Sequence, residues 1–131
     1  MTMEKNKLKE LDQEIKALHR TQEKLEEEQR QVVRQIMEFE EDVQFLTNQY
    51  HHAYKQNSSS TLEIYYQDSL EDIDRMAYRL QERFDSQKDS LNKQIHLNED
   101  QLEDSLNRRH QLLLDNEEER KLKEKGERNG N

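Results

Sequence analysis

The sequence has no cysteine, proline or tryptophan, and both of its glycines, Gly126 and Gly130, fall within the last six residues. Without cysteine, a disulfide scaffold, a thiol nucleophile and a zinc-thiolate site are excluded. Without internal proline or glycine, the chain has few of the residues that form tight turns between strands or loops that bind phosphate. These absences argue against a sheet-containing fold and against an enzyme built on one.

Apolar residues are also scarce, since only 30% of the 131 residues are hydrophobic and 39% are charged. So few apolar side chains cannot fill a globular core, but they can fill a narrow seam between long helices. The net charge of −9 disfavours binding to nucleic acid and to anionic lipid. The start of the chain has no apolar segment typical of a signal peptide, and no apolar run reaches membrane-spanning length. We therefore expect a cytoplasmic protein without membrane insertion, or one exported with its partner by a route that needs no signal peptide.

The first half of the chain carries a seven-residue apolar repeat. Twelve of its fourteen positions are apolar or aromatic, and the two exceptions are Gln22 and Gln29. Such a repeat is typical of a coiled-coil seam, here sustained over about seven heptads. The positions are Leu8, Leu11, Ile15, Leu18, Gln22, Leu25, Gln29, Val32, Ile36, Phe39, Val43, Leu46, Tyr50 and Ala53.

The repeat is interrupted at residues 56–60, where Gln, Asn and Ser favour a turn. Ser60 and Glu63 then have the spacing of a capping box, which predicts the start of a new helix. Gly126 is expected to stop that helix. The prediction is a single domain, 1–131, with a helix over about 3–56, a turn at 57–60, a helix over about 61–125 and a disordered tail at 126–131.

A second apolar stripe follows the turn at roughly helical spacing. Two helices joined by so short a turn should fold back antiparallel, so that residue i faces residue 117 − i if the turn is centred between Ser58 and Ser59. This relation pairs Val33 with Phe84 and Gln29 with Lys88, and it places Tyr50 beside Tyr66. The predicted fold class is all-α, a long antiparallel two-helix hairpin that resembles a coiled coil. The stripe comprises Leu62, Tyr66, Ile73, Leu80, Phe84, Leu91, Ile95, Leu102, Leu106 and Leu113.

Several apolar residues lie off both stripes and are candidates for binding a partner helix. Exposed apolar residues are normal when they occur singly, so a second seam and a scattered surface both remain open interpretations. The run at 112–114 is the clearest case, because three consecutive leucines cannot all face one helix. The candidate partner-binding residues are Val33, Met37, Phe45, Tyr78, Leu97, Leu112 and Leu114.

Charge and aromatic residues are unevenly distributed. Residues 35–74 contain nine acidic side chains and one basic side chain, Lys55, a net charge of −8. All eight aromatic residues lie between Phe39 and Phe84. Either the turn end of the hairpin is a solvated acidic tip, or the two ends of the hairpin meet different surfaces.

No catalytic, cofactor-binding or metal-binding residues are predicted. None of the five histidines forms the Glu-x-x-His motif of di-iron bundles. The neighbours His51 and His52 diverge by about 100° on a helix, a poor arrangement for one metal, so two exposed histidines are favoured over a functional pair. The serines at 58–60 are explained by a turn and a helix cap. Tyr78 and Glu82 match the Tyr-x-x-x-Glu pattern of type VII secretion substrates, which a sequence so rich in Tyr and acidic residues matches about once by chance.

Taken together, several segments resemble the LXG-associated α-helical proteins of Firmicutes, in particular their second class. The resemblance covers roughly residues 20–115. It rests on Glu23–Gln29 leading into Phe39–Asp42, on Tyr65–Asp68, and on Leu102–Arg109 followed by leucines. The chain departs from the WXG100 branch, since it has no Trp-x-Gly turn, is longer than about 100 residues, and lacks a terminal Tyr-x-x-x-Glu.

The resemblance implies a targeting factor rather than an enzyme. Proteins of this kind act like chaperones, packing along the helical LXG domain of a cognate toxin, usually together with a second small helical protein, for export by a type VII secretion system of Gram-positive bacteria. The alternative function is a self-associating coiled-coil scaffold or spacer, which would form a homodimer in isolation. No cofactor is expected in either case.

Overall fold

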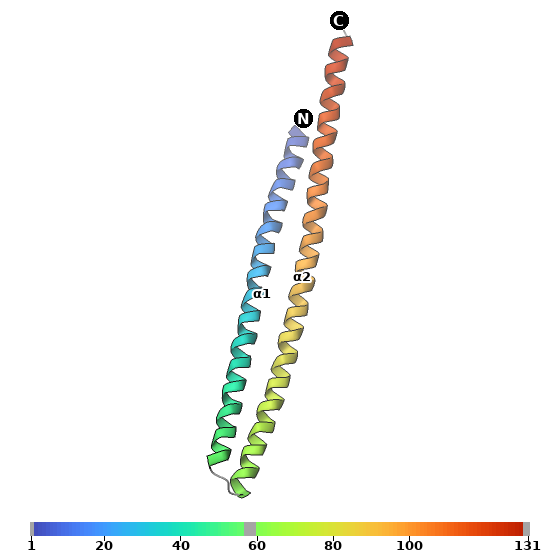
Figure 1. Ribbon diagram of the computed structural model, residues 1–131. Helices are drawn as coiled ribbons and strands as arrows, with labels where there is room; N and C mark the ends of the chain where they lie inside the picture. Colours follow the sequence, from blue (N-terminus) through green and yellow to red (C-terminus); the bar gives the residue numbers. More distant parts are fainter. Residues whose placement is uncertain (1, 57–59, 130–131) are drawn as a thin grey trace. The chain divides into compact units, whose positions relative to one another are not determined.

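The computed structural model describes residues 2–56 and 60–129. They form two α-helices, α1 at Thr2–Gln56 and α2 at Ser60–Asn129, and no strand occurs in these two ranges (Figure 1). The helices pack together as a hairpin, which confirms the predicted all-α fold. Long helices form readily here because neither described helix contains proline, and glycine is absent before position 126.

The chain divides into two compact units. The terminal unit contains Met1–Leu25 and Gln94–Asn131, and the central unit contains Glu26–Lys93. Within each unit, residues farther along α1 contact residues nearer the start of α2. In the terminal unit Asp12 bonds to Arg109 and Leu18 to Asn98, and in the central unit Gln29 bonds to Asn92 while Tyr50 packs on Tyr66. The two helix segments within a unit are therefore antiparallel.

The α1 seam lies where the heptad repeat predicts it. Ile15 and Leu25 are buried in the terminal unit, and Val32, with 3% of its surface exposed, is buried in the central unit. Most other repeat positions are half-buried. Leu46 departs from the pattern, because 44% of its surface is exposed. Burial of this apolar stripe stabilises the helix far more than intrinsic propensity does.

The α2 seam of the terminal unit differs from the predicted stripe. Leu106 and Leu113 are 44% and 38% exposed, whereas Asn98 and Ser105 are buried. The residues that face α1 are spaced alternately three and four positions apart along α2. Polar as well as apolar residues occupy these positions. The buried and half-buried seam positions are Ile95, Asn98, Leu102, Ser105, Arg109, Leu112 and Asn116.

The pairing of the helices in the central unit also corrects the prediction. Tyr50 lies beside Tyr66 as expected, with ring centroids 6.1 Å apart. Phe84, however, packs on Phe39 at 5.7 Å, not on Val33. The relation derived from the turn places Tyr78 opposite Phe39, so it does not give the contact of Phe39 with Phe84, in which the two rings pack at a tilt.

Gln29 also pairs with a residue farther along α2 than predicted. Its Nε2 donates a hydrogen bond to the Oδ1 of Asn92 at 2.8 Å, whereas the predicted pairing placed it opposite Lys88. Asn92 lies one helical turn beyond Lys88, and its amide can accept the hydrogen bond that a lysine ammonium cannot. Gln29 thus forms the expected polar layer, but with Asn92 in place of Lys88.

The α2 helix ends later than the sequence predicts. The helix continues through Gly126 to Asn129, so the predicted stop at 125 and the disordered tail are wrong for residues 126–129. Gly126 does not have a positive φ, and a helical glycine costs only about 1 kcal/mol relative to alanine. The predicted turn residues 57–59, the tail residues 130–131 and the capping side chain of Ser60 lie outside the described part of the structure.

Candidate partner-binding surfaces

A buried amide lies in the seam of the terminal unit. Asn98 is only 5% exposed, and its Nδ2 donates hydrogen bonds to the backbone oxygen of Leu18 at 3.0 Å and to the Oε1 of Gln22 at 2.8 Å. Gln22 in turn donates through Nε2 to the Oε1 of Glu99 at 3.2 Å. A polar group in a seam is tolerated only when it is paired in this way, so it favours one alignment of the helices.

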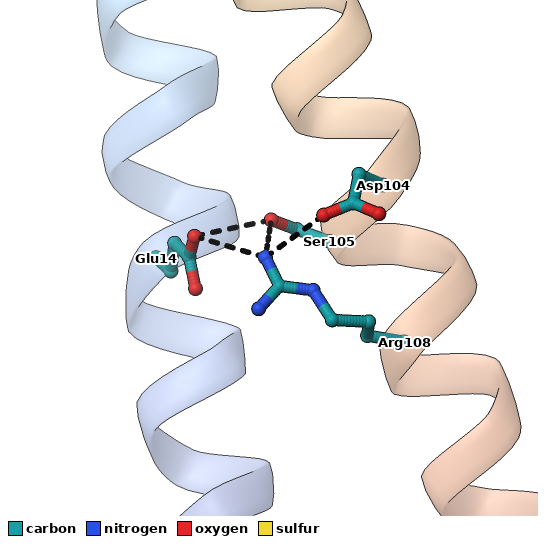
Figure 2. A network of polar contacts seen from close by, with 4 residues as sticks. All are labelled: Glu14, Asp104, Ser105 and Arg108. Carbon is teal, nitrogen blue, oxygen red and sulfur yellow. Dashed lines mark hydrogen bonds and ion pairs between the residues drawn. The ribbon is translucent and has the colours of Figure 1, made fainter.

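A second polar layer of the terminal unit surrounds Ser105, which is fully buried. Figure 2 shows its hydroxyl between Glu14 of α1 and Arg108 of α2. Ser105 Oγ donates to Glu14 Oε1 at 3.3 Å, and Arg108 Nη2 donates to the same oxygen at 3.4 Å. Arg108 also forms an ion pair with Asp104 at 3.1 Å. The small serine side chain leaves room for this cross-helix network.

A half-buried ion pair lies farther toward the N-terminus of α1 in the same unit. Arg109 Nε donates to Asp12 Oδ1 at 2.7 Å. The short distance and partial burial distinguish this pair from the exposed pairs within α2, such as Arg75 with Glu71 at 3.6 Å. Exposed pairs of that kind contribute little to stability.

The central unit relies on rings instead. Besides the Phe39 and Phe84 pair, Tyr66 lies edge-on to both Tyr50 and Tyr54, at 6.1 and 6.4 Å between ring centroids. The Tyr54 hydroxyl donates to Glu63 Oε1 at 3.0 Å. This hydrogen bond, followed by the carboxylate charge, raises the pKa of Tyr54 above its usual value of 10.0. Glu63, which the sequence places in a capping box, therefore joins the two helices.

The structure exposes six of the seven candidate partner-binding residues. Val33, Met37, Phe45, Tyr78, Leu97 and Leu114 have between 40% and 67% of their surface exposed. The exception is Leu112, which is half-buried and lines a small groove with Leu11 and Glu14 of α1. The three consecutive leucines therefore do not all face the same helix. Leu112 faces α1, while the two leucines that follow it are exposed.

The six exposed residues do not form one patch. Val33 and Met37 lie one helical turn apart on α1, whereas Phe45 lies about 80° around the helix from Met37 at 100° per residue. In the terminal unit, Leu97 and Leu114 differ by about 100° around α2. These residues therefore belong to several faces of the two units.

One face of the central unit contains a groove of about 740 Å³ between α1 and α2, which we call the acidic groove. Of the candidate residues, Tyr78 alone lines it. The sequence predicts acids and rings in this unit, but the face that they share depends on the helix pairing, which the sequence predicted only in part. The groove is lined by Phe39, Glu40, Val43, Gln44, Thr47, Asn48, Asp74, Ala77, Tyr78 and Gln81.

Three further observations bear on function. The described residues contain no group of three or more His, Asp or Glu side chains arranged to hold a metal ion. Neither helix has, within its described residues, a stretch long and apolar enough to cross a membrane. Comparisons with protein-family models, curated protein sequences and solved structures find no match to this chain.

Proposed function

We propose that this protein is a non-enzymatic targeting factor that binds the helical LXG domain of a cognate toxin and promotes its export by a type VII secretion system. The toxin domain would pack along the hairpin through apolar side chains, with room for a second small helical protein. The sequence resemblance suggests this partner, and a binding experiment tests the proposal.

The observation that carries the proposal is the exposure of large apolar side chains on helices whose own seam is already filled. Phe45, Tyr78 and Leu97 are each at least 60% exposed. Burying such a side chain against a partner contributes roughly 0.8 kcal/mol per CH₂ group. Because these residues lie on several faces, they suit a partner that contributes more than one helix.

The test is to co-express the chain with a helical LXG domain and to measure complex formation by size-exclusion chromatography with light scattering. We expect a discrete complex with the toxin domain. The triple variant Phe45→Asp, Leu97→Asp and Leu114→Asp should lose the complex, because it buries three charges in the apolar contact. Circular dichroism would check that the variant remains helical.

A matched control adds the same three charges at exposed polar positions. Gln49→Asp, Gln87→Asp and Asn107→Asp should leave the complex intact. Failure of the parent chain to bind any LXG domain would refute the proposal. Equal loss of binding in the two triple variants would show that net charge, and not the apolar contact, governs binding.

The alternative function is a self-associating scaffold, and the same measurement on the chain alone tests it. A stable homodimer that does not bind LXG domains would favour the scaffold function. In that case the Asp substitutions should dissociate the homodimer, because the exposed apolar residues would then be its interface.

A further inference from the structure

We propose that the acidic groove of the central unit binds a basic amphipathic helix, one whose apolar stripe is flanked by Lys or Arg. This inference rests on the proposed function, because it assigns the groove as a contact for a helix of the partner. It adds the place of contact and the chemistry of the bound segment, neither of which follows from the exposed apolar residues alone.

The lining of the groove suits the apolar side of a helix. Phe39 and Val43 belong to the α1 seam, and Ala77 is half-buried on α2. Ala77 has the smallest side chain in the lining, so it leaves space between its larger neighbours. An amphipathic helix that lays its apolar face into such a groove is a common mode of recognition.

The charges of the lining determine which helix fits. Glu40 on α1 and Asp74 on α2 provide one carboxylate from each helix, and the lining contains no basic residue. Beyond the lining, residues 35–74 carry a net charge of −8. A basic helix gains favourable contacts on both sides, whereas an acidic helix meets like charge on both sides.

The same charge argues against a second copy of this chain as the occupant. A symmetric dimer through this face would place the −8 segment of one copy against the −8 segment of the other. Like charges that face each other across an interface disfavour the pairing. The occupant is therefore a partner of opposite charge.

Tyr78 supplies an aromatic anchor at the edge of the groove. Its side chain is 67% exposed, and its hydroxyl is hydrogen-bonded to Glu82, one turn along α2. Exposed tyrosines of this kind are enriched among residues that dominate binding energy.

The probe for the test is a fluorescein-labelled peptide of about four heptads with Leu at its core positions and Lys beside them. Its matched control has Glu in place of every Lys. Fluorescence anisotropy with the full chain should show binding of the Lys peptide that weakens with added salt. The Glu peptide should bind at least about tenfold more weakly.

Variants of the chain locate the binding site. The double substitution Glu40→Lys with Asp74→Lys should weaken the Lys peptide at least about tenfold, and Tyr78→Ala should weaken it at least about fivefold. The control double substitution Glu103→Lys with Glu119→Lys changes charge equally in the terminal unit, at exposed positions, and should leave binding within about twofold. Far-ultraviolet circular dichroism checks that each variant remains helical.

Three results would overturn the inference. The first is equal binding of the Lys and Glu peptides, and the second is equal weakening by the two double substitutions. The third is a homodimer of the parent chain that Glu40→Lys with Asp74→Lys alters, since a second copy would then occupy the groove.

The toxin-domain experiment keeps this inference separate from the proposed function. If the chain binds an LXG domain and Glu40→Lys with Asp74→Lys does not weaken that complex, the function stands and the groove assignment fails. If no LXG domain binds but the Lys peptide binds at the groove, the proposed function fails and the groove remains a site for a basic helix.

Discussion

The terminal and central units use the same two helices but join them by different means. In the terminal unit the seam of α2 carries polar residues, and Asn98, Ser105 and Arg109 all bond to α1. In the central unit the seam is mainly apolar and aromatic, with Phe39 on Phe84, and the Gln29–Asn92 hydrogen bond is a polar layer within it. Hydrogen bonds are directional and fix one alignment, whereas apolar burial is roughly proportional to area and tolerates small shifts.

The units also differ in charge. The terminal unit has 13 basic and 15 acidic side chains, a net charge of −2, whereas the central unit has 8 basic and 15 acidic side chains, a net charge of −7. One unit is thus nearly balanced and internally paired, and the other carries most of the charge that a partner would sense. The comparison separates a part in which directional hydrogen bonds select the helix alignment from a part that carries most of the net charge.

The largest expected effect comes from the apolar seam. Leu91 of the central unit is 5% exposed, and Leu91→Ala should lower the free energy of unfolding by about 2–4 kcal/mol because it leaves a cavity between the helices. Urea unfolding followed by circular dichroism measures the change. Leu97→Ala, at a 60% exposed position, should change stability by no more than about 0.5 kcal/mol. Similar losses at both positions would contradict the assignment of the seam.

The next prediction concerns Ser105, where the space between the helices is too small for a larger apolar side chain. Ser105 is fully buried, so Ser105→Leu should force the helices apart and lower stability by about 1–3 kcal/mol. Ser105→Ala keeps the volume small and should cost less than about 1.5 kcal/mol, the upper range for one hydrogen bond. The same unfolding experiment measures both variants. A gain in stability from leucine would show that Ser105 does not lie between the helices.

A third prediction concerns Asn98, whose side chain can be replaced by an apolar one of similar volume. Asparagine and leucine are similar in size, so Asn98→Leu should raise stability by about 1 kcal/mol by removing a buried amide. It should also broaden the distribution of oligomers seen by light scattering, because the polar group that selects one alignment is gone. Asn107→Leu, at an exposed position, is the control. A single unchanged species would show that Asn98 does not select the alignment.

The smallest expected effect concerns Tyr78. Its hydrogen bond to Glu82, and then the charge of that carboxylate, raise its pKa above 10.0. The bond favours the neutral phenol in the folded chain, so its contribution is complete below pH 10 and is lost as the pH rises through the raised pKa. Glu82→Gln should lower the Tyr78 pKa. Ultraviolet absorbance of the phenolate, compared with Tyr78→Phe, measures the shift, and an unchanged titration would contradict the bond.

The sequence predicted the helices and the α1 seam because both depend on a regular pattern within one segment. Ile15 and Val32 fall on the heptad repeat, and both are buried. The α2 seam of the terminal unit could not be found in this way. Leu106 is apolar and exposed while Ser105 is polar and buried, and only the residues across from them on α1 decide between the two.

The surfaces were predictable to a lesser degree. Exposure of Phe45 and Leu97 followed from their position off the stripe. The acidic groove did not, because Gln44 and Asp74 share a face only once the pairing of the helices is known. Gly126 shows a related limit, since a glycine signals a helix end only if the backbone there adopts a left-handed conformation.

The confinement of every aromatic ring to the central unit gives the molecule a built-in optical label. All eight rings lie between Phe39 and Phe84, and none of the residues of the terminal unit absorbs as tyrosine does. Near-ultraviolet circular dichroism and intrinsic fluorescence thus report on the central unit alone, while the far-ultraviolet signal reports on helix in both units. A single melting experiment can therefore show in which order the two units come apart, without any added dye.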